Sequence, residues 1–297
     1  MSRRFVGNVA LVLTAFIWGV SFVAQRAGSE FLGPFTFNAV RCLLGGISLL
    51  PVIVFFKFIV GDHRTQEEKH IQHKDLFFGG ISCGFVLFCA MSIQQICMQY
   101  VSAGKAGFIS ALYLIFVPII SVFLGLKLNR NVIISIFIAV LGLYFLCYKP
   151  GSAFNIYDGI LLISAFFYGV HILVVDHFSQ KTNAAKLSCL QFFVVSFLSF
   201  LFVCIFEKIS FGSIWACRVP LFYAGVVTCG VAYTLQIFGQ KHTPPVIASL
   251  IFSLESVFAV LGGMLLLNET MTLRELLGCV ALIFAVILSE VKRARAK

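Results

Sequence analysis

Charged side chains are scarce in this sequence. Only 11% of its 297 residues are Asp, Glu, Lys or Arg, whereas 60% are hydrophobic, and the mean hydropathy is +1.01. Soluble domains carry about 25% charged residues, and a single core of this size has no room for so many apolar side chains. The composition therefore excludes a soluble globular protein and predicts a chain that is surrounded by lipid.

Several motifs of enzyme and cofactor chemistry are also missing. The sequence contains no His-Glu-x-x-His, no Walker A loop, no Cys-x-x-Cys and no Cys/His spacing typical of a metal site. Nine of the ten cysteines fall in apolar runs, where they act as small packing residues and predict no disulfide framework. We therefore expect a protein that is not an enzyme, has no cofactor or metal, and is not driven directly by ATP.

What the sequence does have is a series of long apolar runs separated by short polar breaks. A helix needs about 20 apolar residues to cross a bilayer. The runs lie near residues 7–26, 34–57, 76–99, 104–126, 131–148, 157–177, 187–206, 219–239, 245–267 and 272–290. They predict an all-α integral membrane protein with ten transmembrane helices, in which the longest polar break, Gly61–Asp75, is a cytoplasmic loop.

The formal charge of +10 is distributed unevenly between the predicted loops. With the N-terminus inside, fifteen cations lie on the cytoplasmic side: Arg3, Arg4, Lys57, Arg64, Lys69, Lys74, Lys127, Arg130, Lys181, Lys186, Lys241, Lys292, Arg293, Arg295 and Lys297. Six lie outside: Arg26, Lys105, Lys149, Lys208, Arg218 and Arg274. Because cytoplasmic loops are enriched in Lys and Arg, this bias predicts a multi-pass protein of the plasma or inner membrane with both termini in the cytoplasm, and it argues against nucleic acid as the partner.

A short motif near the start returns in the second half. Ala15-Phe16-Ile17-Trp18-Gly19-Val20-Ser21 reappears as Ala165-Phe166-Phe167-Tyr168-Gly169-Val170-His171 at an offset of 150 residues. A division near Lys149–Asn155 leaves five predicted spans on each side, in residues 7–148 and 157–290. Because five is odd, the second copy must enter the membrane from the opposite face, which predicts two inverted five-helix repeats.

Three stretches carry a resemblance to a known family. They are Phe16-Ile17-Trp18-Gly19-Val20-Ser21-Phe22, then Gln94-Gln95 with Ala106–Tyr113 up to Pro118, and Gly230–Gln236 with Ala248–Ser256. Over nearly its whole length the chain resembles the EamA family of the drug/metabolite transporter superfamily. The resemblance implies two five-helix EamA units; similar proteins include amino-acid exporters and sugar carriers. Where such proteins commonly have Glu-Pro, this chain has Glu255-Ser256, so a proline kink is not implied there.

Polar stripes on the first span and its copy are candidate cavity linings. The stripes are Thr14, Trp18, Ser21 and Gln25, and Ser164, Tyr168, His171 and Val175. Each follows helical spacing, so its members share one face. We interpret Trp18, Ser21, Tyr168 and His171 as substrate-binding candidates; the alternative is hydrogen bonding between helices, which Ser and Thr often supply in membranes.

The third and eighth spans carry a second matched pattern. Ser92, Gln95 and Gln99 match Tyr233, Gln236 and Gln240, each set at i, i+3 and i+7. An unpaired amide in hydrocarbon costs several kcal/mol, so these side chains should point inward. We select Gln95, Tyr233 and Gln236, with Tyr113 deep in the fourth span, as further substrate-binding candidates. The neighbouring Gln94 lies about 100° around the helix from Gln95.

Ionisable residues inside the predicted spans are rare and therefore informative. Glu255, midway along the ninth span, is expected to be protonated, paired or in contact with water, and is the main candidate for proton coupling or for binding a cationic group of the substrate. His171 is the second, because an imidazole changes charge near neutral pH. Helix packing remains the alternative for both residues. Arg41 in the second span is interpreted as a structural pairing residue, with substrate binding as the alternative.

These features together predict a secondary transporter that works by alternating access. A lining of amides and aromatic rings with few fixed charges favours export of a small neutral or zwitterionic metabolite, such as an amino acid, over a multiply phosphorylated one. A membrane scaffold or receptor without transport activity is the alternative. Gly262-Gly263 permits close helix contact, which leaves a homodimer open.

Overall fold

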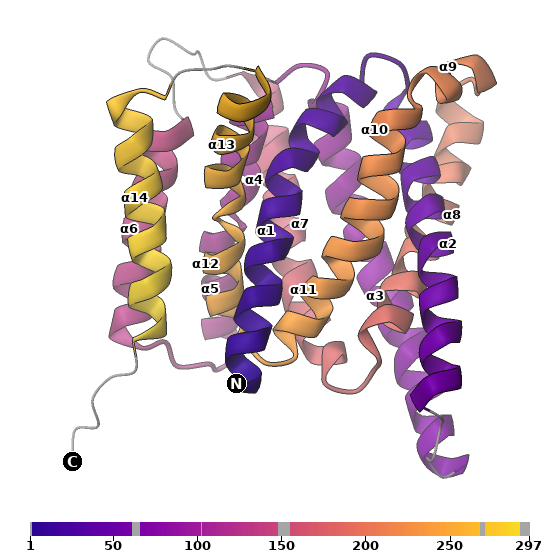
Figure 1. Ribbon diagram of the computed structural model, residues 1–297, viewed down its shortest axis with the longest axis horizontal. Coiled ribbons are helices and arrows are strands. Elements are labelled where there is room, and N and C mark those ends of the chain that lie inside the picture. The colour runs from indigo at the N-terminus through magenta and orange to yellow at the C-terminus, as the bar shows by residue number, and fades with distance from the viewer. Residues whose placement is uncertain (1, 61–65, 102, 148–154, 268–270, 292–297) are drawn as a thin grey trace.

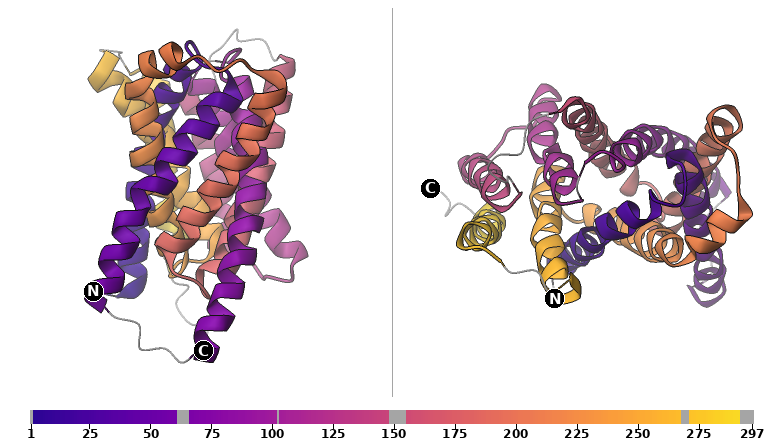
Figure 2. Two further views of the ribbon diagram at one scale, coloured as in Figure 1. Left: turned by 90° about the vertical axis from the view of Figure 1, so that its right-hand side faces the viewer. Right: turned by 90° about the horizontal axis from the view of Figure 1, so that it is seen from above.

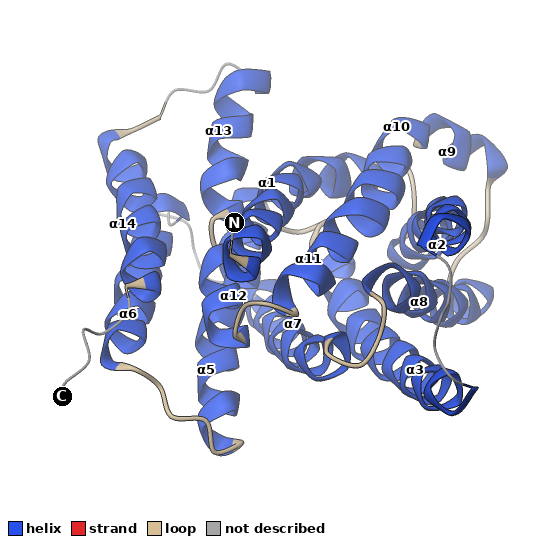
Figure 3. Cartoon of the chain, turned by 60° about the horizontal axis from the view of Figure 1, so that its bottom comes forward, coloured by secondary structure: helices blue, strands red, loops and turns tan. Residues whose placement is uncertain are grey.

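The computed structural model describes residues 2–60, 66–101, 103–147, 155–267 and 271–291, and this part of the chain is helical without a strand (Figures 1 and 3). The elements in order are α1 (Arg3–Gly28), α2 (Pro34–Val60), α3 (Gln66–Cys97), α4 (Ala103–Ala111), α5 (Tyr113–Phe123), α6 (Arg130–Cys147), α7 (Ile156–Ser179), α8 (Ala184–Phe206), α9 (Phe211–Ala216), α10 (Arg218–Phe222), η1 (Tyr223–Ala232), α11 (Tyr233–Gln240), α12 (Pro245–Phe252), α13 (Glu255–Leu267) and α14 (Leu273–Glu290).

Length and composition qualify several helical stretches of the described residues as membrane spans. Seven are both long and apolar enough, and the shorter stretches Arg130–Leu146 and Pro245–Leu261 are also apolar. Large hydrophobic side chains such as Phe123, Phe137 and Ile205 are exposed on the outside of the bundle. An apolar exterior is what a helix bundle presents to lipid, so the chain is a multi-pass membrane protein.

The helices differ from the predicted spans in two ways: one helix begins earlier than expected, and two spans are divided. Helix α3 begins at Gln66, inside the segment Gly61–Asp75 that we expected to be a loop, of which residues 61–65 lie outside the described part. No Gly or Pro follows Gly61 in that segment, so the helix continues beyond its apolar part. The spans expected at 104–126 and 245–267 are each divided into two helices, α4 and α5, and α12 and α13.

Both divided spans break where the backbone tightens into a turn. The Leu112 N–H donates to the carbonyl of Ile109 (3.2 Å), and the Leu254 N–H donates to that of Ile251 (3.1 Å). These three-residue bonds replace the four-residue bonds of an α-helix and change the direction of the chain. Residue 256, directly after Glu255, is a serine, so the second break forms without a proline there.

A rare helix type lies in the apolar helical stretch Arg218–Gln240. Residues Tyr223–Ala232 form the π-helix η1, and the Tyr233 N–H that follows it donates to the Thr228 carbonyl five residues earlier. π-Helical segments are uncommon and often occur at functional sites. The spacing of side chains in this span therefore departs from the 3.6-residue repeat of the rest of the bundle.

Most helix contacts cross between the two halves of the chain. Helix α2 packs against α8. Helix α6 packs against α14, and these two helices stand together at one side of the bundle (Figures 1 and 2). Helix α1 packs against α11 and α13, whereas α7 packs against α3 and α5. The two described ends of the chain lie at the same end of the bundle, where Arg4 and Glu290 form an ion pair at 3.0 Å (Figure 1).

A carboxylate from the end of α8 caps the start of α2. The Glu207 side chain accepts hydrogen bonds from the Phe35 N–H (2.9 Å), the Thr36 N–H (2.8 Å) and the Thr36 hydroxyl (2.6 Å). The first N–H groups of a helix have no partner within it, and the helix dipole favours a negative charge there. Glu207 therefore holds the adjoining ends of these two helices together.

Replacing Glu207 by alanine is expected to lower the free energy of unfolding by about 1–2 kcal/mol, the usual effect of losing a helix cap. The measurement is the thermal unfolding midpoint of the purified protein in detergent. Glu30→Ala is the matched control, because Glu30 is exposed and no hydrogen bond or ion pair holds its side chain in the described residues. Equal midpoints for the two variants would contradict a capping role.

Candidate functional site

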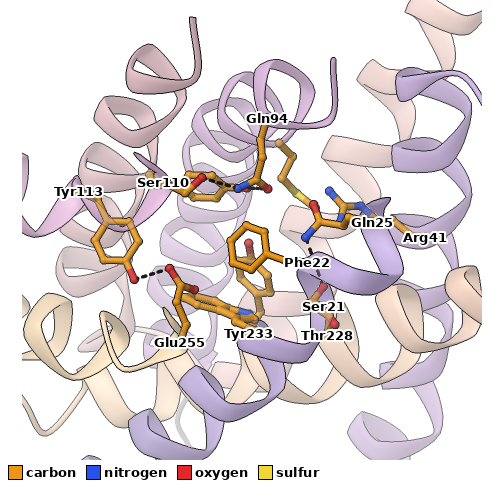
Figure 4. Close-up of a pocket in the computed structure, with 13 residues that line it drawn as sticks. Ser21, Phe22, Gln25, Arg41, Gln94, Ser110, Tyr113, Thr228, Tyr233 and Glu255 are labelled. Carbon is orange, nitrogen blue, oxygen red and sulfur yellow. Dashed lines mark hydrogen bonds between the residues drawn. The ribbon is translucent and has the colours of Figure 1, made fainter. Parts of the chain in front are cut away.

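A cavity lies between the two halves of the bundle, with an empty volume of about 420 Å³. Helices α1, α2, α3, α4, α5, α7, η1, α11 and α13 all contribute to it (Figure 4). Its lining consists of Trp18, Ser21, Phe22, Gln25, Arg41, Met91, Gln94, Ser110, Tyr113, Tyr168, Thr228, Tyr233 and Glu255. The lining combines aromatic rings with a few polar groups, as ligand sites do.

One hydrogen bond joins the two broken spans across the cavity. The Tyr113 hydroxyl donates to Glu255 Oε1 at 3.0 Å (Figure 4). Tyr113 is the first residue of α5 and Glu255 is the first residue of α13, so the bond connects the two points at which the helices resume. Both side chains are buried. The arrangement places a carboxyl group at the N-terminus of a helix inside the protein, where the helix dipole stabilises negative charge.

A second set of hydrogen bonds ties three helices together on the α3 side. The Gln94 amide nitrogen donates to the Ser110 hydroxyl, and the Tyr168 hydroxyl donates to the Gln94 amide oxygen, both at 2.9 Å. Because Gln94 uses both ends of its amide, it links α3 to α4 and to α7. This part of the lining is therefore held in one arrangement.

Aromatic rings form the wall that the first and eighth spans share. The Trp18 ring lies 4.9 Å from the Tyr233 ring and 5.1 Å from that of Phe252, and Tyr233 also meets Phe192 edge-on at 5.2 Å. The indole nitrogen of Trp18 is buried and has no hydrogen-bond partner among the described residues. A buried donor without a partner is costly, which makes this wall a place where a bound molecule gains a hydrogen bond.

Arg41 brings a positive charge to the cavity. Its side chain is 2% exposed, its Nε donates to Asn38 Oδ1 at 2.9 Å, and its guanidinium carbon lies 5.2 Å from the centre of the Phe37 ring. The terminal Nη2 has no hydrogen-bond partner among the described residues. We expected a structural pairing residue; the partners found are an amide oxygen and an aromatic ring.

The structure brings six of the predicted site residues together. These are Trp18, Ser21, Tyr113, Tyr168 and Tyr233 of the substrate-binding set and the proton-coupling candidate Glu255. Three others are buried but do not line the cavity. The Gln95 amide nitrogen donates to the Gln25 carbonyl (3.2 Å), that of Gln236 donates to Gln240 Oε1 (2.9 Å), and His171 Nε2 lies 3.1 Å from Gln191 Oε1.

Other cavity residues were not selected from the sequence. They are Phe22, Gln25, Arg41, Met91, Gln94, Ser110 and Thr228. Two of them could have been identified from the sequence: Gln25 continues the polar stripe of the first span, and Arg41 is an intramembrane charge. Phe22 and Met91 could not, because apolar residues are found throughout this sequence and do not mark a cavity. Among the described residues, no group of three or more His, Cys, Asp and Glu is placed to hold a metal ion.

Comparison with known proteins finds relatives over the whole chain. The model of the EamA-like transporter family matches residues 5–148 and again residues 155–290. An uncharacterized transporter of Archaeoglobus fulgidus is 29% identical over 292 residues, covering 98% of this chain and 87% of its own. The uncharacterized transporter YoaV of Bacillus subtilis is 21% identical over 309 residues and covers both chains fully. One solved crystal structure, 17% identical in sequence, shares the fold with a TM-score of 0.72 over 97% of this chain and 98% of its own.

Proposed function

Because this chain belongs to the EamA-like transporter family, we propose that it is a secondary transporter that exports a small neutral or zwitterionic metabolite, such as an amino acid, across the plasma or inner membrane by alternating access. The relatives compared above carry the name of transporter, which supports this class of function. The family and the fold leave the cargo open, so the cavity must supply the argument for it.

Two inverted five-helix repeats, residues 7–148 and 157–290, are part of the proposal. The family model matches the chain twice, once in each half. The helix contacts also come in matched pairs: α1 packs against α13 as α7 packs against α5, and α1 packs against α11 as α7 packs against α3. Exchange of partners between equivalent helices is what a two-fold relation between the halves produces, and it supports alternating access around one site.

The observation that carries the proposal is the meeting of the two broken spans at the cavity. In many transporters, discontinuous helices in corresponding positions of two repeats form the substrate site near the middle of the membrane. Here the breaks at Leu112 and at Ser253–Leu254 precede Tyr113 and Glu255, which both line the cavity and bond to each other. A scaffold has no need of a polar cavity bounded by two helix breaks.

We propose an orientation with both termini in the cytoplasm. The described ends of the chain lie at one end of the bundle, as an even number of spans requires (Figure 1). The excess of Lys and Arg in the loops expected at that end supports a cytoplasmic position. Labelling of single cysteines placed at Arg3 and at Lys297 of a variant whose ten native cysteines are replaced by serine, in intact and in opened cells, tests this orientation.

Transport itself is tested by two measurements on the full-length protein. Untargeted metabolomics of cells with and without it should show a small metabolite that accumulates inside cells that lack the protein. Purified protein in liposomes should then move that metabolite. If the liposomes move no solute of a broad metabolite panel and efflux from cells is unchanged, the protein is not a transporter and the scaffold or receptor alternative stands.

Trp18→Ala is expected to reduce the flux of the identified metabolite by roughly tenfold, because it removes the ring that packs on Tyr233 and with it part of the cargo-binding wall. A tenfold effect corresponds to a loss of about 1.4 kcal/mol of cargo binding. Trp215→Ala is the matched control, since Trp215 is the other tryptophan of the chain and is exposed on α9. Flux into liposomes is the measurement, normalised to folded protein. Equal fluxes for the two variants would remove Trp18 from the proposed binding site.

A further inference from the structure

Arg41 is a buried charge without a charged partner in the described part of the chain. An arginine side chain keeps its positive charge inside proteins, and buried charges are normally paired with an opposite charge. Its contacts, the Asn38 amide oxygen and the Phe37 ring, are neutral, and no described carboxylate forms an ion pair with it. Neither contact cancels the charge, so a bound anion would satisfy Arg41 where the protein itself does not.

The free hydrogen-bonding capacity of Arg41 lies at the cavity. Nη2 has no partner among the described residues, and the side chain lines the cavity beside Gln25 (Figure 4). A guanidinium group is planar and can donate two parallel hydrogen bonds to one carboxylate. Gln25 Oε1 also lacks a partner, but an amide oxygen carries no charge to balance the guanidinium. A carboxylate is therefore the ligand group that fits this end of the cavity.

The opposite charge belongs to a different part of the lining. Figure 4 shows Arg41 and Glu255 on opposite sides of the Phe22 ring, with Glu255 next to Tyr113. Tyr113 donates to Glu255 Oε1, which leaves Oε2 for another donor. A cargo with a carboxylate alone would satisfy only Arg41, and one with an ammonium group alone would satisfy only Glu255.

We propose that the cargo is a small zwitterion, which binds with its carboxylate on Arg41, its ammonium group toward Glu255 and its uncharged part against the aromatic wall. This inference rests on the transport function proposed above and narrows it, since it excludes neutral metabolites. It also gives Arg41 the role of carboxylate-binding residue. A phosphate group, with two negative charges near neutral pH, would face a single cation here.

Trp18 provides a direct reading of this binding. It is one of two tryptophans, so Trp215→Phe leaves the cavity tryptophan as the only source of indole fluorescence. The purified full-length Trp215→Phe protein is titrated with each of the twenty proteinogenic amino acids, and binding of tryptophan, whose own indole would mask the signal, is followed by equilibrium dialysis. The one that binds most tightly is then compared with its carboxamide, which lacks the carboxylate, and with its N-acetyl derivative, which lacks the ammonium group.

We expect the carboxamide and the N-acetyl derivative each to bind at least about tenfold more weakly than the parent amino acid, the effect of losing about 1.4 kcal/mol. Adding Arg41→Gln should weaken binding of the amino acid by a similar factor and leave the carboxamide unchanged. Adding Arg130→Gln instead, at an exposed arginine that begins α6, should change neither. Thermal unfolding of each variant shows whether it is folded, and Arg41→Lys, which keeps the charge, should restore part of the binding.

Three results would overturn the inference. They are the absence of binding by any of the twenty amino acids, equal binding of acid and carboxamide, and a preference for the acid that survives Arg41→Gln in folded protein. The metabolomic and liposome measurements report on transport independently of this titration. Export of an uncharged metabolite would thus contradict the zwitterion inference and leave the proposed transport function standing, whereas absence of any flux would contradict the transport function itself.

Discussion

Glu255→Gln is expected to reduce cargo flux by at least about tenfold while leaving the protein folded. Glutamine keeps the shape of the side chain and an oxygen that accepts from the Tyr113 hydroxyl, but it has no negative charge and cannot carry a proton. A hydrogen bond to a charged group contributes about 1.5–3 kcal/mol, and 1.4 kcal/mol is a factor of ten. The measurement is uptake of the identified cargo into liposomes under a proton gradient.

Glu290→Gln is the matched control for this substitution. Glu290 pairs with Arg4 at the end of the bundle, away from the cavity, so its loss should leave flux unchanged. Flux at the wild-type rate in Glu255→Gln would contradict any role of the carboxyl group in transport. The same assay includes His171→Gln at the buried imidazole, because dependence on the proton gradient that survives both substitutions would exclude Glu255 and His171 as proton carriers.

Gly19→Ala is expected to lower the free energy of unfolding by roughly 1–3 kcal/mol, the usual range for overpacking a tight contact. A Cβ atom at Gly19 would lie 2.5 Å from the Glu255 carbonyl oxygen and 2.8 Å from the Ala259 nitrogen. Both are backbone atoms, so no side-chain rotation relieves the overlap and α1 must move away from α13. Transport should fall with stability, because this contact joins the wall that holds Trp18 to the broken span.

Two other glycines, both in α7, make this a graded test. At Gly169 the added atom would meet Phe116 Cβ at 3.1 Å, a smaller overlap, so the loss should be intermediate. At Gly159 nothing lies within 4 Å, and alanine should be neutral or stabilising by up to about 1 kcal/mol, because it favours a helix more than glycine does. Thermal unfolding of the three alanine variants in detergent should follow this order. An equal effect at Gly19 and Gly159 would show that close packing of α1 and α13 is not required.

The sequence predicted much of the fold because the strongest signals were long and periodic. The family resemblance, carried by the Phe16–Phe22 and Gly230–Gln236 motifs, is confirmed, and the long apolar runs correspond to helices. The two breaks were not predictable from local sequence. Leu112 and Leu254 are not helix-breaking residues, and the residue after Glu255 is Ser256, not a proline that would signal a kink. Both broken spans pack against a helix of the other half of the chain, α4 and α5 against α7, and α12 and α13 against α1.

The cavity was predicted in part for a related reason. Stripes at helical spacing led to Trp18, Ser21, Tyr168 and Tyr233, which line it. They also led to Gln95, which bonds to the Gln25 carbonyl on α1, and to Gln236, which bonds to Gln240 on its own helix. Periodicity identifies a face that points inward, whereas the choice between a helix contact and an open space depends on how the other helices fill the interior. Gln94 lies on a different part of its helix from Gln95 and still reaches the cavity, because several helices surround α3.

The π-helix η1 changes which of its residues are expected to face the cavity in a residue-by-residue accessibility experiment. Thr228 and Tyr233 both line the cavity although they are five residues apart. On an α-helical wheel that spacing separates two side chains by about 140°, whereas the π-helical bond from Tyr233 to Thr228 brings them to the same side. Accessibility experiments on residues Tyr223 to Ala232 that assume 3.6 residues per turn would therefore assign the wrong residues to the cavity side and to the lipid side of this helix.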